Sequence, residues 1–346
     1  MKSKLLVWGT GSYADRALKK ELAPYLQDII AFVDSNAKRR SLFYDKSIVS
    51  PTEALKLDYD LLIIASSYFP EIVKQAIDLG FEEKKIGFST ALKFLEYQEK
   101  LSQQTLQALL KVPFWYHTYE ILPGVMTPGR CPYKPELIEN SLVQDLSGLR
   151  ALDIGAWDGP YTLEMTRRGA KVTALDIQPP THSGFDTMRR LNDLDVNHFC
   201  DSVYDLSPDR HGSYDLVTFF GVYYHLKNPL AAFSAINRVL PKGGLMLVEG
   251  AILEGSNHID PFWKDREKQL EQMKGLPVAA YVKENYQGIW SNWWVPTLSC
   301  LHHWIESSGF EILESHNNRV QTRAWCVARK VNDDLLEHPI LSKAPL

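Results

Sequence analysis

The sequence is poor in cysteine, and its cysteines are widely spaced. Its four cysteines are Cys131, Cys200, Cys300 and Cys326. No C-x-x-C pair occurs, so neither a zinc knuckle nor a redox motif is present, and we interpret all four as buried free thiols. The ten histidines include no H-E-x-x-H motif, and the adjacent His302 and His303 would point to different faces of a helix. We therefore expect no metal site.

Long hydrophobic runs and an excess of either charge are also missing. No stretch approaches the roughly 18 uncharged apolar residues that cross a bilayer, and residues 1–9 lack the apolar middle of a signal peptide. We therefore expect a soluble, cytoplasmic protein without membrane contact. The 38 basic and 42 acidic side chains give a formal charge of −4, which provides no electrostatic footprint for nucleic acid. A local basic patch stays open.

The composition is that of a folded protein with more than one core. The chain has 346 residues, is 45% hydrophobic and contains 16 Tyr, 14 Phe and 9 Trp. At roughly 100–200 residues per domain, two domains are expected. In the first hundred residues, short apolar runs alternate with segments of helical spacing, a pattern typical of βαβ units. The expected strands are residues 4–8, 29–33 and 61–65, and the expected helices are 13–22 and 70–79.

A second alternating series follows, and it predicts a second α/β sheet. Its strands are expected at residues 151–154, 171–175, 196–199, 216–220 and 244–248. A helix near 297–307 and two strands, 310–314 and 322–328, would close the sheet with a C-terminal β-hairpin. The fold class is thus α/β with two Rossmann-like domains, residues 1–100 and 101–346. A helical segment at 91–110 is expected to connect them.

The first glycine-rich turn is typical of a phosphate-binding site. Gly9, Gly11 and Ala14 form a G-x-G-x-x-A pattern between a strand and a helix, and Asp34 ends the next strand where a ribose acceptor would stand. The same glycines also serve close packing of helix on strand, so a nucleotide in this domain stays open. The turn, with Ser50-Pro51-Thr52-Glu53, resembles the small Rossmann-like domains in front of nucleotide-sugar and surface-glycan modifying enzymes.

The second glycine-rich turn differs because a carboxylate precedes its glycines. In the stretch Asp153-Ile154-Gly155-Ala156-Trp157-Asp158-Gly159, Asp153 would repel a phosphate and suits a cationic ligand. S-adenosylmethionine (SAM) carries an ammonium and a sulfonium and no phosphate. Asp176 ends the second strand where it can accept the ribose hydroxyls. The stretch Asp201-Ser202-Val203 after the third strand is expected to hold adenine.

These motifs resemble those of the class I SAM-dependent methyltransferases. The likeness covers about residues 111–330 and includes the 153–159 turn, Asp176, the fourth-strand motif from Phe220 and Gly221 to Leu226, and the Leu240-Pro241-Lys242-Gly243-Gly244 turn. As cofactor-binding residues it implies a set spread over these motifs: Asp153, Gly155, Asp158, Gly159, Asp176, Asp201, Ser202 and Gly221.

The sequence is similar in particular to the group that includes the tRNA wobble-uridine carboxymethyltransferase. The matching stretches are Trp115–Thr118, Thr127–Gly129, Gly221–His225, Asn292–Pro296 and Arg323–Lys330. In that enzyme a lysine, a tyrosine and an arginine hold the extra carboxylate of carboxy-SAM. The resemblance implies Lys111, Tyr224 and Arg323 for these roles. The match of Lys111 rests on the stretch Lys111-Val112-Pro113-Phe114 alone.

Charge and the front domain set this sequence apart from the tRNA enzyme. Residues 101–346 carry 23 basic and 28 acidic side chains, and phosphate contacts supply most non-specific affinity for nucleic acid. We therefore predict a SAM-dependent methyltransferase acting on a small molecule or glycan precursor. Transfer to tRNA from SAM or carboxy-SAM and a non-catalytic SAM-binding scaffold are the alternatives. A homo-oligomer stays open.

Methyl transfer needs few polar groups, because the carbon is already activated by the sulfonium. His225 follows the fourth strand and is the candidate general base, with a structural role as the alternative. Tyr224 is expected to contact donor or acceptor, with filling of the core as the alternative. His117 lies on a segment that could cover the donor or, through Trp115 and Tyr116, only seal the contact between the domains. The Trp290–Trp294 cluster is interpreted as core or as a wall of the acceptor pocket. Arg130 and Arg323 are available for an acidic acceptor.

Overall fold

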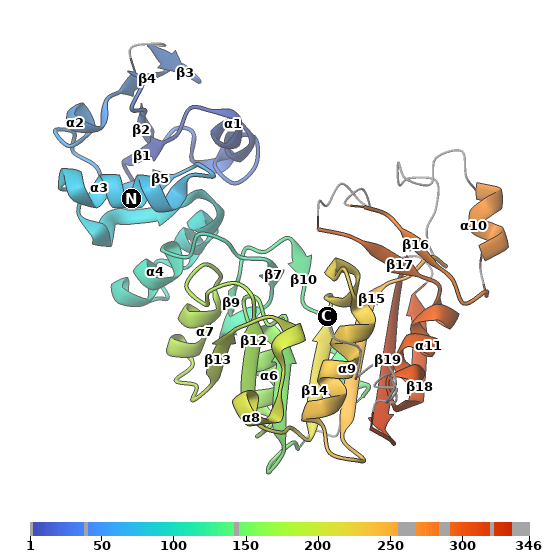
Figure 1. Ribbon diagram of the computed structural model, residues 1–346. Helices are drawn as coiled ribbons and strands as arrows, with labels where there is room; N and C mark the ends of the chain where they lie inside the picture. Colours follow the sequence, from blue (N-terminus) through green and yellow to red (C-terminus); the bar gives the residue numbers. More distant parts are fainter. Residues whose placement is uncertain are drawn as a thin grey trace, which may run out of the picture. The chain divides into compact units, whose positions relative to one another are not determined.

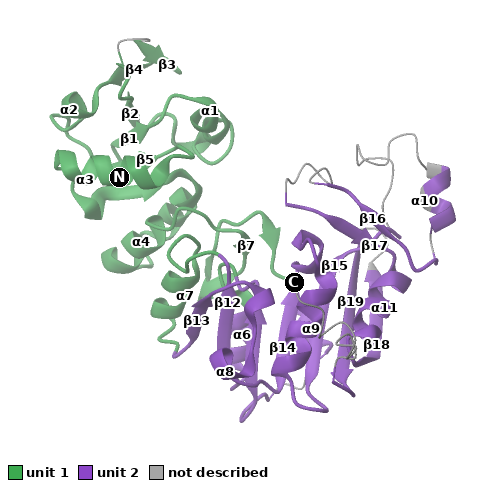
Figure 2. Ribbon diagram, viewed as in Figure 1, with its two compact units in different colours: residues 1–133, 157–160, 178–194 green, residues 134–156, 161–177, 195–346 purple. Residues whose placement is uncertain are grey.

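The chain forms two compact units in the computed structural model, each described here by itself (Figure 2). The structure describes residues 3–37, 41–141, 145–254, 267–273, 275–283, 291–318 and 322–333. Unit 1 comprises residues 1–133, 157–160 and 178–194, and unit 2 comprises residues 134–156, 161–177 and 195–346. The predicted domain boundary at residue 100 stays a prediction.

Unit 1 contains a six-stranded sheet of order β3-β4-β2-β1-β5-β6, parallel except for β3 (Figure 1). Its elements are β1 (Leu5–Trp8), α1 (Ser12–Leu18), η1 (Ala23–Tyr25), β2 (Ile29–Val33), β3 (Leu42–Phe43), β4 (Lys46–Val49), α2 (Pro51–Ala54), β5 (Leu61–Ile64), α3 (Phe69–Leu79), η3 (Glu83–Lys85) and β6 (Ile86–Phe88). Strand β1 is buried along its whole length, because helices of a parallel sheet cover both faces. Ser50 and Glu53 form the capping box that starts α2.

The rest of unit 1 consists of short elements. They are η4 (Ser89–Tyr97), α4 (Gln103–Leu110), β7 (His117–Thr118), β8 (Glu120–Leu122), β9 (Val125–Met126), β10 (Cys131–Pro132) and α7 (Phe185–Leu191). The helical segment expected at 91–110 is thus a 3₁₀ stretch followed by α4. Strands β7 and β10 pair in parallel, with Cys131 opposite His117.

Unit 2 is built on a seven-stranded sheet of order β13-β12-β11-β14-β15-β19-β18 (Figure 1). Its sheet strands are β11 (Arg150–Ile154), β12 (Lys171–Asp176), β13 (Asn197–Cys200), β14 (Leu216–Phe220), β15 (Leu245–Ala251), β18 (Phe310–Asn318) and β19 (Arg323–Lys330). Strands β11 to β15 run parallel, whereas β19 is antiparallel to both β15 and β18. The strand order reverses between β11 and β14, the place where open α/β sheets bind ligands.

Helices and a small hairpin complete unit 2. They are α5 (Glu136–Glu139), α6 (Pro160–Arg167), η5 (Val203–Asp205), α8 (Pro208–His211), η6 (Tyr223–His225), α9 (Pro229–Val239), α10 (Glu267–Met273), β16 (Ala279–Tyr281), β17 (Trp294–Pro296) and α11 (Leu298–Ser307). Phe233 of α9 and Ile305 of α11 join Val217 and Val248 of the sheet in one buried core. The predicted fold class, two α/β Rossmann-like domains with a C-terminal β-hairpin on the second, is confirmed.

Candidate functional site

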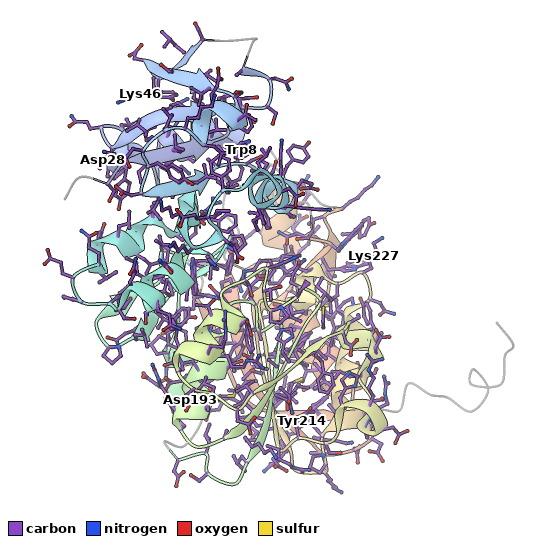
Figure 3. All side chains as sticks on the ribbon, turned by 90° about the vertical axis from the view of Figure 1, so that its left-hand side faces the viewer. Trp8, Asp28, Lys46, Asp193, Tyr214 and Lys227 are labelled. Atoms are coloured by element: carbon purple, nitrogen blue, oxygen red, sulfur yellow. The ribbon has the colours of Figure 1, made fainter. Side chains whose placement is uncertain are left out.

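The carboxyl edge of the unit 2 sheet is shaped by two glycine turns. Gly155 follows β11 with φ +75°, and Gly221 follows β14 with φ +73°, a region that favours glycine. A Cβ atom on Gly155 would stand 2.4 Å from Cγ2 of Val222, so the two turns pack directly on each other. Figure 3 labels Tyr214, just before β14, and Lys227, beyond it, near opposite ends of this sheet.

The carboxylate of Asp153 lies inside this edge. The residue is only 2% exposed, and its two oxygens accept hydrogen bonds from Thr162 Oγ1 (2.6 Å) and Thr218 Oγ1 (2.7 Å). These bonds tie β11 to α6 and β14. The Asp153 carboxylate thus lies two residues before the turn that begins at Gly155. The predicted attraction between this carboxylate and a cationic ligand stays a prediction.

Asp176 ends β12 and is followed directly by Ile177, which the motifs of the sequence did not single out. Asp176 is 5% exposed, whereas the side chain of Ile177 is 69% exposed. Ile177 thus places an exposed apolar surface directly after the acidic end of the strand. The signal was available in the sequence as an isoleucine directly after the acidic strand end.

Asp201 and Ser202, after β13, already have partners within unit 2. Asp201 pairs with Arg210 at 2.7 Å and with Nε2 of buried His211 at 3.2 Å. The Ser202 hydroxyl caps η5 by accepting from the Tyr204 backbone N–H at 3.3 Å. Their predicted contact with adenine stays a prediction.

Two adjacent tyrosines in the fourth-strand motif have different roles. Tyr223 is fully buried, donates to the Ala251 carbonyl at 2.7 Å and packs on Gly250, where a Cβ atom would stand 2.4 Å from its ring. Burial raises the pKa of Tyr223 well above its ordinary value. The Tyr224 hydroxyl instead accepts from Arg323 Nη1 at 3.1 Å. Tyr223 is therefore structural, and Tyr224 carries the polar group of the motif.

Arg323 is the centre of a charge cluster in unit 2, in which Glu249 is buried and the Arg323 and Lys134 side chains are half-buried. Its Nε and Nη2 donate to the two carboxylate oxygens of Glu249 at 2.8 and 2.5 Å, and Lys134 Nζ lies 3.3 Å from Glu249 Oε1. Burial would raise the pKa of Glu249, but the charge of Arg323 and its hydrogen bonds hold it below the ordinary value. Two cations and one anion give these three side chains a net charge of one positive unit.

His225 is held in one orientation beside this cluster. Its Nδ1 lies 3.2 Å from the Ser291 carbonyl oxygen and 3.1 Å from Ser291 Oγ. A carbonyl only accepts, so Nδ1 carries the proton and the lone pair is on Nε2. Burial lowers the pKa of His225, and the charge of Arg323 lowers it further, against the Ser291 hydrogen bond. The neutral ring can therefore accept a proton at pH 7.

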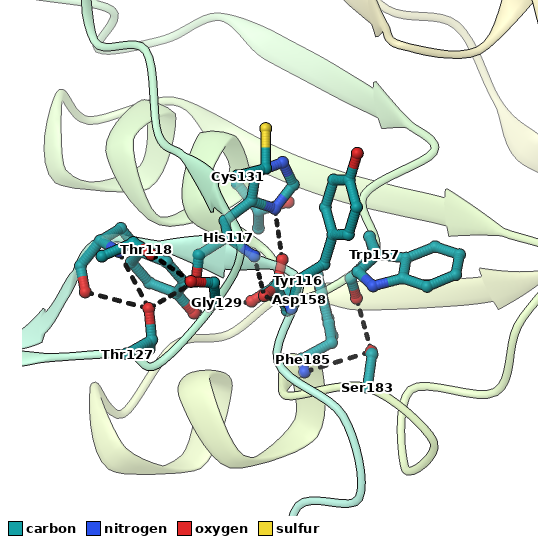
Figure 4. Close-up of polar contacts among 12 residues, drawn as sticks. Tyr116, His117, Thr118, Thr127, Gly129, Cys131, Trp157, Asp158, Ser183 and Phe185 are labelled. Atoms are coloured by element: carbon teal, nitrogen blue, oxygen red, sulfur yellow. Dashed lines mark hydrogen bonds and ion pairs between the residues drawn. The ribbon is translucent and has the colours of Figure 1, made fainter. Parts of the chain in front are cut away.

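In unit 1, His117 is bound to Asp158 (Figure 4). Asp158 is fully buried; its Oδ2 accepts from the backbone N–H groups of Tyr116 and His117, both at 2.8 Å, and its Oδ1 lies 2.5 Å from His117 Nδ1. Tyr119 Oη donates to the Asp158 carbonyl at 2.7 Å. Asp158, predicted as a cofactor contact, thus anchors the segment that carries His117. Gly159 has φ +83°, and a Cβ atom on it would stand 2.2 Å from Cε of Met188. Glycine at this position therefore leaves room for the Met188 side chain.

The other predicted residues of unit 1 are engaged locally. Lys111 is the C-cap residue of α4, and its Nζ donates to Glu83 Oε1 at 3.1 Å. Arg130 is 4.0 Å from Glu21. In the first glycine turn, Asp34 accepts hydrogen bonds from Thr10 Oγ1 and from the Asn36 N–H.

Among the described residues, no group of three His, Cys, Asp or Glu side chains is arranged to hold a metal ion. Within the same ranges, no helix has the length and apolar character needed to cross a membrane. Of the four cysteines, Cys300 and Cys326 are buried, Cys131 is half-buried and Cys200 is exposed, so the prediction that all four are buried is wrong. Trp263 and Trp290 lie outside the described residues.

Comparison with protein families gives two matches. Residues 130–315 match the family model described as "Methyltransferase domain", and residues 1–87 match "C2185-like, N-terminal".

Three curated relatives illustrate the similarity. The "tRNA U34 carboxymethyltransferase" of Mannheimia succiniciproducens is 26% identical over 239 residues, 65% of this chain and 66% of that protein. The protein of the same name from Pseudomonas fluorescens is 28% identical over 168 residues, 48% of this chain and 46% of that one. The "Ubiquinone biosynthesis O-methyltransferase" of Xanthomonas oryzae is 35% identical over 108 residues, 30% of this chain and 44% of that one. The chain thus spans about half to two thirds of the first two relatives.

Proposed function

The chain belongs to the SAM-dependent methyltransferase family, and from this premise we propose that it transfers a carboxymethyl group from carboxy-SAM to a uridine of tRNA. The names of its relatives support this proposal. The observation that carries it is the cluster of Tyr224, Arg323, Glu249 and Lys134. Its excess of one positive charge, on two half-buried cations around the buried Glu249 carboxylate, suits a ligand carboxylate.

The remaining residues of the carboxyl edge fit a SAM-type donor. Asp176 offers a carboxylate for ribose hydroxyls, and the exposed side chain of Ile177 offers an apolar surface for adenine. Bound there, the donor would supply a carbon activated by its sulfonium. His225 would take on Nε2 the proton of a hydroxyl group on the acceptor uridine, whose oxygen would form the bond to the carboxymethyl carbon as S-adenosylhomocysteine leaves. Tyr224 and Arg323 would orient the carboxylate.

A second candidate is methyl transfer from ordinary SAM to a small molecule or glycan precursor. The charge balance favours it, because residues 101–346 carry 23 basic and 28 acidic side chains. The two candidates differ in donor and in acceptor, so each can be tested separately.

Calorimetric titration with SAM and with carboxy-SAM tests the donor. We expect carboxy-SAM to bind at least about tenfold more tightly, a difference of about 1.4 kcal/mol. Tyr224→Phe, which keeps the ring, and Arg323→Gln should reduce this preference. Arg329→Gln is the matched control on the same strand, because Arg329 forms an exposed pair with Glu311.

The outcomes separate the candidates. Equal binding of both donors would contradict the carboxymethyl proposal and favour the second candidate; binding of neither would contradict the donor assignment. Retention on immobilised tRNA that weakens steeply with salt would support the tRNA acceptor, and retention indifferent to salt or absent would contradict it.

A further inference from the structure

An aromatic surface lies on the small β16–β17 hairpin of unit 2. Tyr281 of β16 stands opposite Trp294 of β17. The Tyr281 ring lies 5.0 Å from the Trp294 ring and 6.1 Å from the Trp293 ring, measured between centroids. Tyr281 is 51% exposed. We call Tyr281, Trp293 and Trp294 the aromatic platform.

The platform is attached to the turn that holds Tyr224 and His225. The Trp293 backbone N–H donates to the Tyr224 carbonyl at 2.8 Å, and the indole N–H of Trp294 donates to the Lys227 carbonyl at 3.0 Å. Ser291, two residues before Trp293, holds the His225 ring. A ring bound on the platform therefore lies close to the candidate base.

Packing alone does not account for these rings. Side chains alternate across the hairpin, and the core face is supplied by Val282 and Val295, which are 2% and 0% exposed. Tyr281 and Trp294 are opposite each other on the other face. An exposed tyrosine flanked by two tryptophans is a surface on which planar rings stack.

Charge at the platform favours a nucleotide over a neutral ring. Lys227, labelled in Figure 3, is exposed, and its Nζ lies 4.5 Å from the centre of the Trp293 ring. This ammonium group places a positive charge beside the stacking surface, where it can attract the phosphate of a bound nucleotide.

We propose that the aromatic platform stacks the acceptor base of an RNA, with Lys227 facing its phosphate. This inference rests on the proposed function and adds to it the acceptor subsite. Stacking of one base on an aromatic side chain contributes to the affinity, so removing one ring should weaken binding about tenfold.

The test measures binding of uridine 5′-monophosphate and of a synthetic anticodon stem-loop RNA to the full chain. Tryptophan fluorescence reports binding of both probes. Tyr281→Ala should weaken both about tenfold, whereas Tyr281→Phe, which keeps the ring, should stay within about twofold of the original. Lys227→Gln should weaken both probes, because both carry phosphate, and should lower the salt slope of RNA binding by about one.

Donor titration by calorimetry accompanies each variant. Unchanged donor affinity with weakened RNA binding supports the platform. Equal RNA affinity in Tyr281→Ala and the original chain would overturn the proposal, as would a joint loss of donor and RNA affinity, which indicates a structural role. If the original chain binds the donor but neither probe, the platform proposal fails and the donor assignment stands; if it binds no donor, the proposed function fails instead.

Discussion

At the residue scale, buried carboxylates organise both units. Asp153 accepts from two threonines and Asp158 from two backbone N–H groups and a histidine ring. An acid buried in this way is held by directed hydrogen bonds, and each bond fixes the position of a neighbouring chain segment. Asp153 and Asp158 lie five residues apart in one motif, yet Asp153 fixes α6 and β14, whereas Asp158 fixes the segment that carries His117.

Asp158→Asn should destabilise the protein by about 3 kcal/mol, because an amide presents its own N–H groups to donors that need an acceptor. Denaturant unfolding measures the change. Asp215→Asn is the control: its carboxylate pairs with Arg150 at a surface where the two side chains are 31% and 50% exposed, and its loss should cost less than about 1 kcal/mol. Equal costs for the two variants would contradict the anchoring role of Asp158.

The pH dependence of turnover follows from His225. A general base acts in its neutral form, and burial lowers the pKa of His225 below the ordinary 6.5. Turnover should therefore be independent of this group near pH 7 and fall only as the pH drops through the lowered pKa. His303→Gln, an exposed control, should leave the profile unchanged. An acid limb with its midpoint above pH 6.5, measured as release of S-adenosylhomocysteine, would argue against His225 as the base.

At the element scale, the two glycines of the first turn have different reasons to be glycine. Gly9 has φ +136°, and a Cβ there would stand 2.4 Å from the Ala65 carbonyl oxygen, whereas a Cβ on Gly11 would have no atom within 4 Å. Gly9 thus serves the close approach of β1 and the end of β5. Gly11 is not required by packing within the described structure.

Gly9→Ala should consequently destabilise unit 1 by about 2–3 kcal/mol, because both the backbone conformation and the space are unsuitable. Gly11→Ala should cost less than about 1 kcal/mol. Thermal unfolding of the two variants compares them directly. A larger loss for Gly11→Ala would show that the turn is packed differently from the structure described here.

At the scale of the whole molecule, sequence patterns predicted the features that depend on neighbouring residues, namely strands and turns. Apolar runs gave the strands β1, β2 and β11, and the acid-glycine turn pointed to the carboxyl edge of the second sheet. The resemblance implied a shared site for Tyr224 and Arg323, but the contacts of Lys134 and Arg323 with Glu249 could not be predicted, because they span 115 and 74 residues. Only the antiparallel register of β15 and β19 brings Arg323 to the strand that carries Glu249. The His117–Asp158 pair, 41 residues apart, likewise depends on the fold.

The most direct test of the account is a crystal structure of the chain with carboxy-SAM. We expect the donor at the carboxyl edge of the unit 2 sheet, with its ribose on Asp176 and its extra carboxylate hydrogen-bonded to Tyr224 and Arg323. A donor bound elsewhere, or one whose carboxylate points away from Arg323, would contradict the central claim.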